Sequence, residues 1–481
     1  IALVVVAVLV AVADRYGYHR DEFYYLAAGA HPAFGYVDQP PLTPLIAHAA
    51  RLLFGDSLVG LRLTPALATG LTVLFTGMIA SALGGGRGAT SLAAASIAVA
   101  AFPIATGHVL STSTFDLLAW TVLSWLLVRA LRDGGPVWLA AGAVAGLGLE
   151  NKTLLVALPA AVGLGVLLAG PRTALRGRWP WLGALLAVLL WVPNLLWQAA
   201  RGWPQLTMAS AIATVGNGGS APWWQFIPFQ LVLVGPLLVP VWLAGWWSLA
   251  RDPARRRYRG FAVAYLVLLA GLLAVGGKPY YLVGMYPVLL AAGAEPTLRW
   301  VRLGRARVRG ALLGVALLLN AVATAVLMLP LLPARLLPGS PMVAVQPLSA
   351  ESVGWPEFAA TVSRAYQALP AAWRPSTVLL AGNYGEAGAV ELFRDRMPLP
   401  PAYSGQNGYV DWGPPPESAD TVLAVGMAES SLRRWFSSVT PVARIDNGIG
   451  LDNQEQGRAV WLCHGRQASW AEIWTSVRRV S

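Results

Sequence analysis

The sequence predicts a mainly α-helical protein, in which a bundle of about eleven transmembrane helices precedes a C-terminal α/β domain. Of the 481 residues, 56% are hydrophobic and only 12% are charged, whereas soluble domains have roughly 25% charged residues. The apolar residues gather in long runs, and basic clusters alternate with acidic and aromatic segments between these runs. This pattern excludes a disordered chain, a nucleic-acid-binding domain and a small secreted scaffold, so we expect no nucleic acid as a partner.

Eleven apolar stretches, each long enough to span the hydrocarbon core or nearly so, predict the transmembrane domain of residues 1–332. Proline and glycine interrupt several of them, so we expect some helices to be tilted or broken. The first stretch would span only roughly 20 Å of a core of about 30 Å, so we expect its helix to begin upstream of Ile1. The stretches are residues 1–13, 58–83, 90–107, 115–131, 136–150, 153–170, 181–198, 226–250, 261–275, 280–297 and 310–332.

Basic clusters orient these helices. Arginines occupy every second loop, and the positive-inside rule places such loops in the cytoplasm. We therefore expect an inner-membrane protein whose N-terminus is cytoplasmic and whose long first outer loop, residues 14–57, and C-terminal domain are extracytoplasmic. The clusters are Arg87; Arg129 and Arg132; Arg172, Arg176 and Arg178; Arg251, Arg255, Arg256, Arg257 and Arg259; and Arg302, Arg305, Arg307 and Arg309.

The C-terminal region, residues 333–481, is much less hydrophobic and follows a proline-rich linker at 330–347. Strand-like runs at Thr377–Ala381, Thr421–Val425 and Ala459–Cys463 are separated by helix-like stretches. They predict a small extracytoplasmic α/β domain. The single cysteine, Cys463, cannot form an internal disulfide.

The first outer loop concentrates acidic residues. Asp21 and Glu22 follow the first helix directly. Asp38 comes before a Pro-Pro pair, with one residue between them. Apolar residues after Pro41 have helical spacing and suit a helix in the interfacial plane. Asp116, near the start of the fourth helix, is expected on the same side, and a carboxylate near a helix end facing a polar cavity is a candidate functional residue. The alternative is that the acids only cap or solvate the loop.

Two lysines stand apart from the arginines. Lys152 lies between the fifth and sixth helices and Lys278 between the ninth and tenth, on the outer side where the positive-inside rule does not place them. An ammonium group can hold a phosphate as a point charge, although each lysine can instead snorkel to lipid headgroups. Together with the carboxylates and aromatic rings, these ammonium groups fit a substrate that carries a lipid tail, a phosphate and a sugar.

This order of motifs resembles the GT-C glycosyltransferases, in particular the bacterial branch related to the protein O-mannosyltransferases of family 39 and the lipid A aminoarabinose transferases. The resemblance covers residues 14–300. It rests on Asp-Glu after the first helix, Asp-Gln-Pro at 38–40, the aspartate of the fourth helix, both lysines, and Tyr286-Pro287 after Lys-Pro-Tyr-Tyr. The glycine-rich stretches 382–388 and 404–407 resemble a bacterial subset of these proteins.

The resemblance implies an inverting glycosyltransferase that moves a hexose or pentose from a polyprenyl-phosphate donor to an acceptor hydroxyl on the outer face of the membrane. The acceptor is a glycan, a lipid or a protein, and membrane lipids are further partners. By position, Asp21 is the base. By the same resemblance, the donor and its phosphate are bound by Lys152, Lys278, Tyr280 and Tyr281. The site is organised by Glu22, Asp116 and Gln39.

One departure from the family concerns residue 39, where relatives often have lysine. Gln39 supplies no positive charge for phosphate binding at this position. A divalent metal is a further hypothesis, with Asp38 as a ligand and His31 or His108 beside it. The histidines show no recognisable ligand spacing.

Two other classes of function compete with this interpretation. A transporter or flippase of lipid-linked sugars would have polar residues at mid-membrane depth and commonly inverted repeats. This sequence places its ionisable residues near one face and shows no repeat. A non-catalytic glycan-binding protein would present aromatic residues of its C-terminal domain, such as Trp355, Tyr384 and Tyr403, to sugars.

Overall fold

The computed structural model describes residues 1–215 and 223–479. The chain divides into two compact units. The membrane unit comprises Ile1–Ala13, Gln39–Thr43 and Arg62–Leu329, and the α/β unit comprises Asp14–Asp38, Pro44–Leu61 and Pro330–Ser481. Most of the first outer loop, which we expected within the transmembrane domain, therefore groups with the C-terminal residues.

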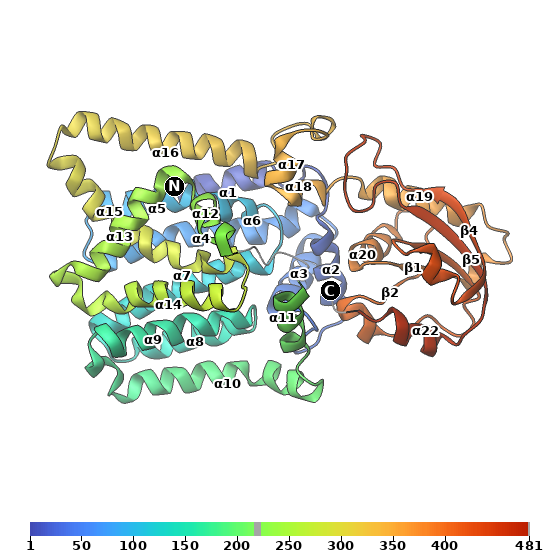
Figure 1. Ribbon diagram of the computed structural model, residues 1–481, viewed down its shortest axis with the longest axis horizontal. Coiled ribbons are helices and arrows are strands. Elements are labelled where there is room, and N and C mark those ends of the chain that lie inside the picture. The colour runs from blue at the N-terminus through green and yellow to red at the C-terminus, as the bar shows by residue number, and fades with distance from the viewer. Residues whose placement is uncertain (216–222, 480–481) are drawn as a thin grey trace. The chain divides into compact units, whose positions relative to one another are not determined.

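All eleven apolar stretches are helical. Five are single helices long and apolar enough to cross a membrane, two are bent pairs, and four are shorter. The chain is a multi-pass membrane protein, with five such spans in its described part, or seven if each bent pair is one span. Figure 1 shows the long helices of the membrane unit side by side. The helices of this unit are α1 (Ala2–Ala11), α4 (Leu58–Ala82), α5 (Arg87–Ala98), α6 (Ala101–Gly107), α7 (Thr112–Asp133), α8 (Val137–Leu149), α9 (Ala157–Ala169), α10 (Arg178–Ala200), α11 (Pro204–Val215), α12 (Trp223–Val234), α13 (Val239–Arg251), α14 (Arg259–Ala274), α15 (Tyr286–Arg302) and α16 (Ala306–Met328).

Glycine pairs hold neighbouring helices at close range. A Cβ atom on Gly142 of α8 would lie 2.1 Å from the carbonyl oxygen of Gly183 in α10. One on Gly165 of α9 would lie 2.2 Å from that of Gly260 in α14. In lipid, where helices gain little from hydrophobic burial, such small residues let backbones approach and pack. The order of the helices thus depends on residues without side chains.

Both bent helix pairs release backbone carbonyls that lipid cannot hydrate. The chain bends by 60° between α5 and α6 and by 86° after α12. Asn320 of α16 donates from Nδ2 to the carbonyl of Val99 at 2.7 Å and to that of Val234 at 3.4 Å. Thr324 donates to Val99 as well, at 2.8 Å. Gly235, with φ of +105°, leaves room for the Asn320 side chain. The buried side-chain amide of Asn320 therefore donates a hydrogen bond to one free carbonyl at each of the two breaks. Such partners are required in a hydrocarbon environment.

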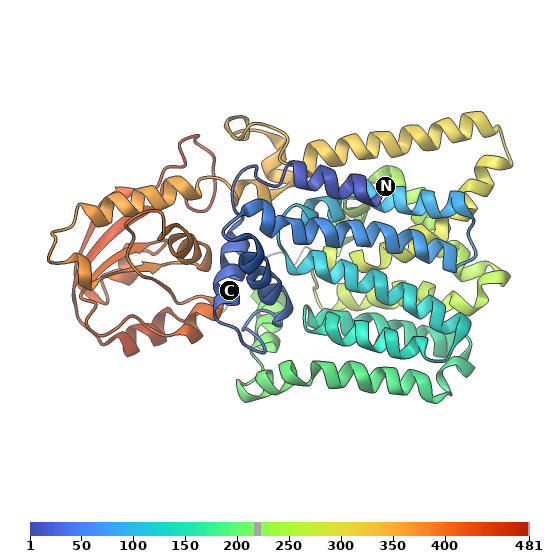
Figure 2. The same ribbon diagram turned by 180° about the vertical axis from the view of Figure 1, so that it is seen from behind.

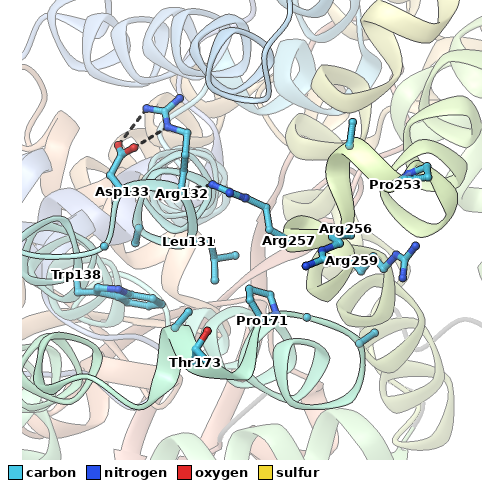
Figure 3. A pocket seen from close by; sticks show the side chains of 16 residues that line it. Leu131, Arg132, Asp133, Trp138, Pro171, Thr173, Pro253, Arg256, Arg257 and Arg259 are labelled. Atoms are coloured by element: carbon cyan, nitrogen blue, oxygen red, sulfur yellow. Dashed lines mark hydrogen bonds and ion pairs between the residues drawn. The ribbon is translucent and has the colours of Figure 1, made fainter.

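Polar loops meet at the two ends of the membrane unit. At one end, Nη1 of Arg132 donates to the carbonyl of Ala82 at 3.1 Å, and Arg257 reaches the carbonyl of Arg132 at 3.5 Å. One cavity there (Figure 3) is lined by residues 130–134, Trp138, residues 169–171, 173–174 and 253–254, and Arg256, Arg257 and Arg259. At the other end, residues 150–152 contact the start of α7. This segregation agrees with the alternation of loops expected from the charges.

The α/β unit contains a five-stranded sheet of order β2-β1-β3-β5-β4. Strand β1 pairs in parallel with β2 and β3, and β5 pairs antiparallel with β3 and β4. The three expected strands are confirmed, the last extending to Arg466. Figures 1 and 2 show this sheet from both sides. The elements of the unit are α2 (Arg20–Ala30), α3 (Leu42–Phe54, its first two residues in the membrane unit), α17 (Pro341–Val345), α18 (Pro347–Ala350), α19 (Trp355–Gln367), β1 (Thr377–Ala381), α20 (Tyr384–Phe393), β2 (Ala402–Ser404), β3 (Thr421–Val425), α21 (Glu429–Leu432), β4 (Phe436–Arg444), β5 (Ala459–Arg466) and α22 (Trp470–Val477).

Central strands β1 and β3 are buried along their whole length. Val378 and Leu380 of β1 join Trp470 and Ile473 of α22 in one apolar cluster. Alternate residues point to the opposite face, and Leu379 there is also fully buried. Helices α19 and α20 contact β4 and β1. Coverage of both faces explains why these strands read as continuous apolar runs.

Replacing Asn320 tests the repair of the helix breaks. Asn320→Leu leaves the Val234 carbonyl without this donor and Val99 with one donor fewer, so we expect the free energy of unfolding to fall by about 1–3 kcal/mol. Thermal unfolding in detergent, followed by tryptophan fluorescence, measures the change. Val322→Ala, on an exposed position of the same helix, is the control. Equal melting temperatures for both variants would contradict the role of Asn320.

Candidate functional site

A charged pair lies at the end of the membrane unit opposite the arginine-lined cavity. Asp116, in the second turn of α7, is 8% exposed, and its Oδ2 lies 3.8 Å from Nζ of Lys152. Trp120, one turn further along α7, donates its indole N–H to Oδ1 of Asp116 at 3.1 Å. A charge beside hydrocarbon is retained only with partners of this kind. The structure thus brings together two residues that the sequence singled out separately.

Two tyrosines surround the ammonium group of this pair. Nζ of Lys152 lies 5.4 Å from the ring centroid of Tyr280 and 5.0 Å from that of Tyr281, within the range of a cation–π interaction. The rings stand edge to face, with centroids 4.9 Å apart. Both belong to the 3-10 helix η5 (Pro279–Met285), which Gln230 fixes by donating to the carbonyl of Pro279 at 2.9 Å. Positive charge and aromatic surface therefore share one place.

Hydrogen bonds hold the Lys152 segment. The amide of Asn151, 1% exposed, accepts from Thr43 at 2.6 Å and donates to the carbonyl of Thr112 at 2.9 Å. The backbone N–H of Leu42 donates to the carbonyl of Glu150 at 2.8 Å. These bonds join the segment that follows Asp38 to the start of α7. Lys152 is consequently held in place rather than placed on a free loop.

The remaining predicted residues of this unit differ in environment. Gln39 is 4% exposed, and its Nε2 is buried with no hydrogen-bond partner among the residues that the structure describes. Such a donor is costly unless something binds it. Lys278 is half-buried at the N-cap of η5, two residues before Tyr280. Gln39 thus brings a donor, without the charge that lysine would carry there.

The α/β unit holds the acids of the first outer loop. Asp21, in the first turn of α2, has a side chain 36% exposed. Its Oδ1 accepts from the hydroxyl of Tyr384 at 2.7 Å and lies 3.7 Å from Nε of Arg20. Nη2 of Arg20 also donates to the Tyr384 hydroxyl, at 3.1 Å. The carboxylate is therefore oriented by neighbours and still reaches solvent.

Glu22, next to Asp21, is completely buried. Its Oε2 accepts from the backbone N–H of His19 at 2.8 Å, and the ring of His19 accepts from the N–H of Asp21 at 3.2 Å, so that the two residues form a capping box. The second ring nitrogen of His19 lies 2.8 Å from Oε2 of Glu351. Glu22 organises this region by fixing the start of α2, which places Asp21.

Glycines of the motif at 382–388 explain how α20 approaches α2. A Cβ atom on Gly388 would lie 2.7 Å from Cβ of Phe23, and one on Gly385 would lie 2.9 Å from Cβ of Arg20. This close approach carries Tyr384 to Asp21. The sequence alone gives this motif no role and offers Tyr384 only as an aromatic residue for glycan binding.

Burial shifts the titration of Asp38. Its Oδ1 accepts from the hydroxyl of Tyr24 at 2.7 Å, and the Tyr24 ring packs between Tyr384 and Trp412. Burial raises the pKa of Asp38 to about 6, although the Tyr24 hydrogen bond acts in the opposite direction. Tyr24 is a further residue that the sequence did not single out. Asp38 therefore changes charge close to neutral pH.

The donors proposed for a metal do not form a metal site. Nδ1 of His31 lies 3.0 Å from the carbonyl oxygen of Ala27, and its ring stacks on Trp412. His108 is a buried residue of the membrane unit. Across residues 1–215 and 223–479, no group of three or more His, Cys, Asp or Glu side chains is placed to hold an ion. We derive no step through a metal.

Of the aromatic residues expected for a glycan-binding protein, Trp355 and Tyr384 are buried and Tyr403 is half-buried. Trp355 is 2% and Tyr384 9% exposed. The indole N–H of Trp355 donates to the carbonyl of Glu351 at 2.9 Å, and its ring packs edge to face on Phe23. These side chains stabilise the α/β unit, which weakens the non-catalytic alternative.

Glu22 offers a test of the capping box. Glu22→Ala removes the acceptor of the His19 N–H, so we expect the melting temperature to fall by the equivalent of about 1 kcal/mol. Glu22→Gln keeps an acceptor and should melt closer to the wild type. Calorimetry of the full chain in detergent measures both. A larger loss in the Gln variant than in the Ala variant would contradict the cap.

Asp38 gives a pH dependence of known sign. Because its pKa is raised in the folded chain, Asp38 contributes stability that is present below its ordinary value near 4 and is lost as the pH rises through about 6. Relative to Asp38→Asn, the wild type should lose at most about 3 kcal/mol between pH 4 and 7. Melting temperatures of both proteins across this range test the prediction, and parallel curves would refute it.

Known proteins share parts of this sequence and its fold. A family model described as dolichyl-phosphate-mannose-protein mannosyltransferase matches residues 38–197. The undecaprenyl phosphate-alpha-4-amino-4-deoxy-L-arabinose arabinosyl transferase 1 of Pseudomonas fluorescens is 26% identical over 299 residues, which are 58% of this chain and 54% of that protein. The chain spans about half the length of the curated relatives it matches.

Solved structures establish the fold. ArnT from Cupriavidus metallidurans bound to undecaprenyl phosphate superposes with a TM-score of 0.62 at 17% identity, over 96% of this chain and 97% of that one. The archaeal oligosaccharyltransferase AglB from Archaeoglobus fulgidus, in complex with an inhibitory peptide and a dolichol-phosphate, has a TM-score of 0.51 at 12% identity, over 88% and 69% of the chains. The chain has the GT-C fold, and the resemblance to aminoarabinose transferases is confirmed.

Proposed function

We propose that this GT-C chain is an inverting glycosyltransferase that moves a sugar from a polyprenyl-phosphate donor to an acceptor hydroxyl at the outer face of the inner membrane. One observation carries the proposal: the buried Asp116 carboxylate and the half-buried Lys152 ammonium form a pair beside two tyrosine rings, at the end of an apolar bundle remote from its arginine loops. The relative from Pseudomonas fluorescens is named as an arabinosyl transferase of undecaprenyl phosphate. Its name supports a lipid-phosphate donor here.

Lys152 serves the leaving group in this proposal. An ammonium carries three N–H donors, and Asp116 approaches it from one side at 3.8 Å. The other donors are then available to oxygens of the donor phosphate, whose negative charge grows as the bond to the sugar breaks. Tyr280 and Tyr281 offer aromatic surface to the lipid or the sugar. Lys278, two residues earlier, adds a second ammonium, and the amide of Gln39 adds a neutral donor.

Asp21 is the proposed base. Its carboxylate takes the proton of the acceptor hydroxyl, and the hydroxyl oxygen forms a bond to the anomeric carbon. The bond between that carbon and the phosphate oxygen breaks, and the polyprenyl phosphate leaves with the electron pair. Attack opposite the leaving group inverts the anomeric centre. Tyr384 and Arg20 orient the carboxylate, and partial exposure lets an acceptor reach it.

Replacing the base should stop transfer. Asp21→Asn keeps an acceptor for the Tyr384 hydroxyl but cannot take a proton, so we expect the rate to fall about 100-fold or more. Transfer is measured in nanodiscs with a panel of labelled polyprenyl-phosphate sugars and with crude membrane lipids and wall glycans as acceptors. Asp395→Asn, an exposed acid of the same unit, is the control. Activity of Asp21→Asn within a few-fold of the wild type would remove Asp21 as the base.

Replacing either lysine should weaken donor binding. We expect Lys152→Ala and Lys278→Ala each to raise the Kd for a labelled polyprenyl phosphate about tenfold, because each loses a charge-assisted contact. Lys→Arg at the same positions restores the charge, and Arg87→Ala removes an exposed charge from a loop of the other set. Unchanged Kd values would exclude the phosphate role. Movement of intact donor between leaflets without product would favour a flippase.

A further inference from the structure

A cavity of about 800 Å³ opens at the end of the membrane unit remote from Lys152. Three segments far apart in the sequence form it: the end of α7 with the start of α8, the turn after α9, and the 3-10 helix η4 (Pro253–Tyr258) with the start of α14. Figure 3 shows Arg256 and Arg259 on one side, Trp138 on the other, and Pro171 and Thr173 below, with Arg257 reaching across toward Arg132. We call this space the arginine cavity.

Positive charge dominates its lining. Four arginines and one carboxylate line the space. Arg132 is paired with that carboxylate, because its Nε and Nη2 donate to the two oxygens of Asp133 at 2.7 and 3.0 Å. Within the described chain, Arg256, Arg257 and Arg259 form no ion pair. Guanidinium forks match the oxygens of a phosphate group, so the lining fits an anion of that kind.

The neighbouring Arg255 has a different role. It is 7% exposed, and its Nη1 donates to Oγ of Ser248 at 3.0 Å and to the carbonyl of Ala292 at 2.6 Å. Asp252 caps the same turn by accepting from the N–H of Ala254 at 2.9 Å. These bonds anchor the backbone turn that carries the following arginines, and the side chains of Arg256 and Arg257 remain exposed and accessible to a ligand.

Arg259 has a buried donor that no described residue satisfies. Its Nε is buried, and residues 1–215 and 223–479 give it no hydrogen-bond partner. A buried charged donor left unpaired is costly. Arg259 also begins α14, a helix that passes into the hydrocarbon region. A ligand oxygen is the partner that this position lacks.

The volume of the arginine cavity and the residues around it indicate which class of ligand it can bind. A volume of about 800 Å³ exceeds a single phosphate ion and accommodates a phosphate with attached glycerol groups. Trp138 borders the space, and tryptophan is typical of the membrane–water interface. Apolar residues from two helix ends, including Leu131, complete the wall. Basic pockets between transmembrane helices suit anionic lipid headgroups.

We propose that the arginine cavity binds the phosphate group of an anionic phospholipid, with Arg256, Arg257 and Arg259 as its donors. A soluble phosphate compound carries the same chemistry, and the experiment separates the two sources. This site is independent of the proposed transferase site, because its residues come from the opposite loops of the bundle.

Native mass spectrometry of the full chain in detergent tests the proposal, with phosphatidylglycerol, phosphatidylcholine and inorganic pyrophosphate as separate probes. We expect phosphatidylglycerol to bind at least tenfold more tightly than phosphatidylcholine. Arg256→Gln/Arg257→Gln should weaken phosphatidylglycerol at least tenfold. The matched control is Arg305→Gln/Arg307→Gln, which removes two exposed arginines from another loop of the same set and should leave binding unchanged.

The outcomes are distinct. Loss of phosphatidylglycerol in the first double variant alone supports a lipid site. Pyrophosphate that binds and is lost in that variant alone, without lipid binding, supports the phosphate chemistry and overturns the lipid source. Equal losses in both double variants, or binding of neither anion, overturn the proposal. Transfer activity does not enter this readout, so failure here leaves the proposed transferase function untouched.

Discussion

A hydrocarbon environment leaves no polar group without a partner, and the polar residues of the membrane unit follow from this constraint. Asn320 lies deep in an apolar helix because two broken helices expose carbonyls that only a side-chain donor can satisfy. At these two breaks the chain bends by 60° and 86° and does not continue as a straight span. Where such a partner is provided, an irregular backbone becomes tolerable in the membrane.

The same need for polar partners applies to the Asp116–Lys152 pair. Removing either partner would leave an uncompensated buried charge, so the pair persists only if it is stable as a pair or used by a ligand. Its separation of 3.8 Å and its tyrosine neighbours favour use, because a phosphate would complete the coordination of the ammonium. If the pair had only a structural role, the ammonium and the carboxylate would be expected to approach to the distance of a direct hydrogen bond.

The α/β unit applies a comparable logic outside the membrane. The capping box of His19 and Glu22 fixes the first turn of α2, and glycines of α20 allow that helix to approach closely. Asp21 then receives a tyrosine hydroxyl from a segment more than three hundred residues away. The Asp21 carboxylate is therefore held in a defined orientation and is still exposed enough for an acceptor to reach it. The two adjacent acids of one motif thus have different tasks, one structural and one proposed as chemical.

The sequence alone determined the helical stretches, the alternation of their loops and three strands of the sheet, because hydropathy and charge act through local patterns. It also singled out Asp21, Asp116 and the two lysines by residue type and position. Only the tertiary structure decided that Asp116 meets Lys152, that Tyr384 meets Asp21, and that three arginines share a cavity with Trp138. These meetings join segments tens to hundreds of residues apart, and such contacts depend on how whole helices pack, which no local pattern specifies.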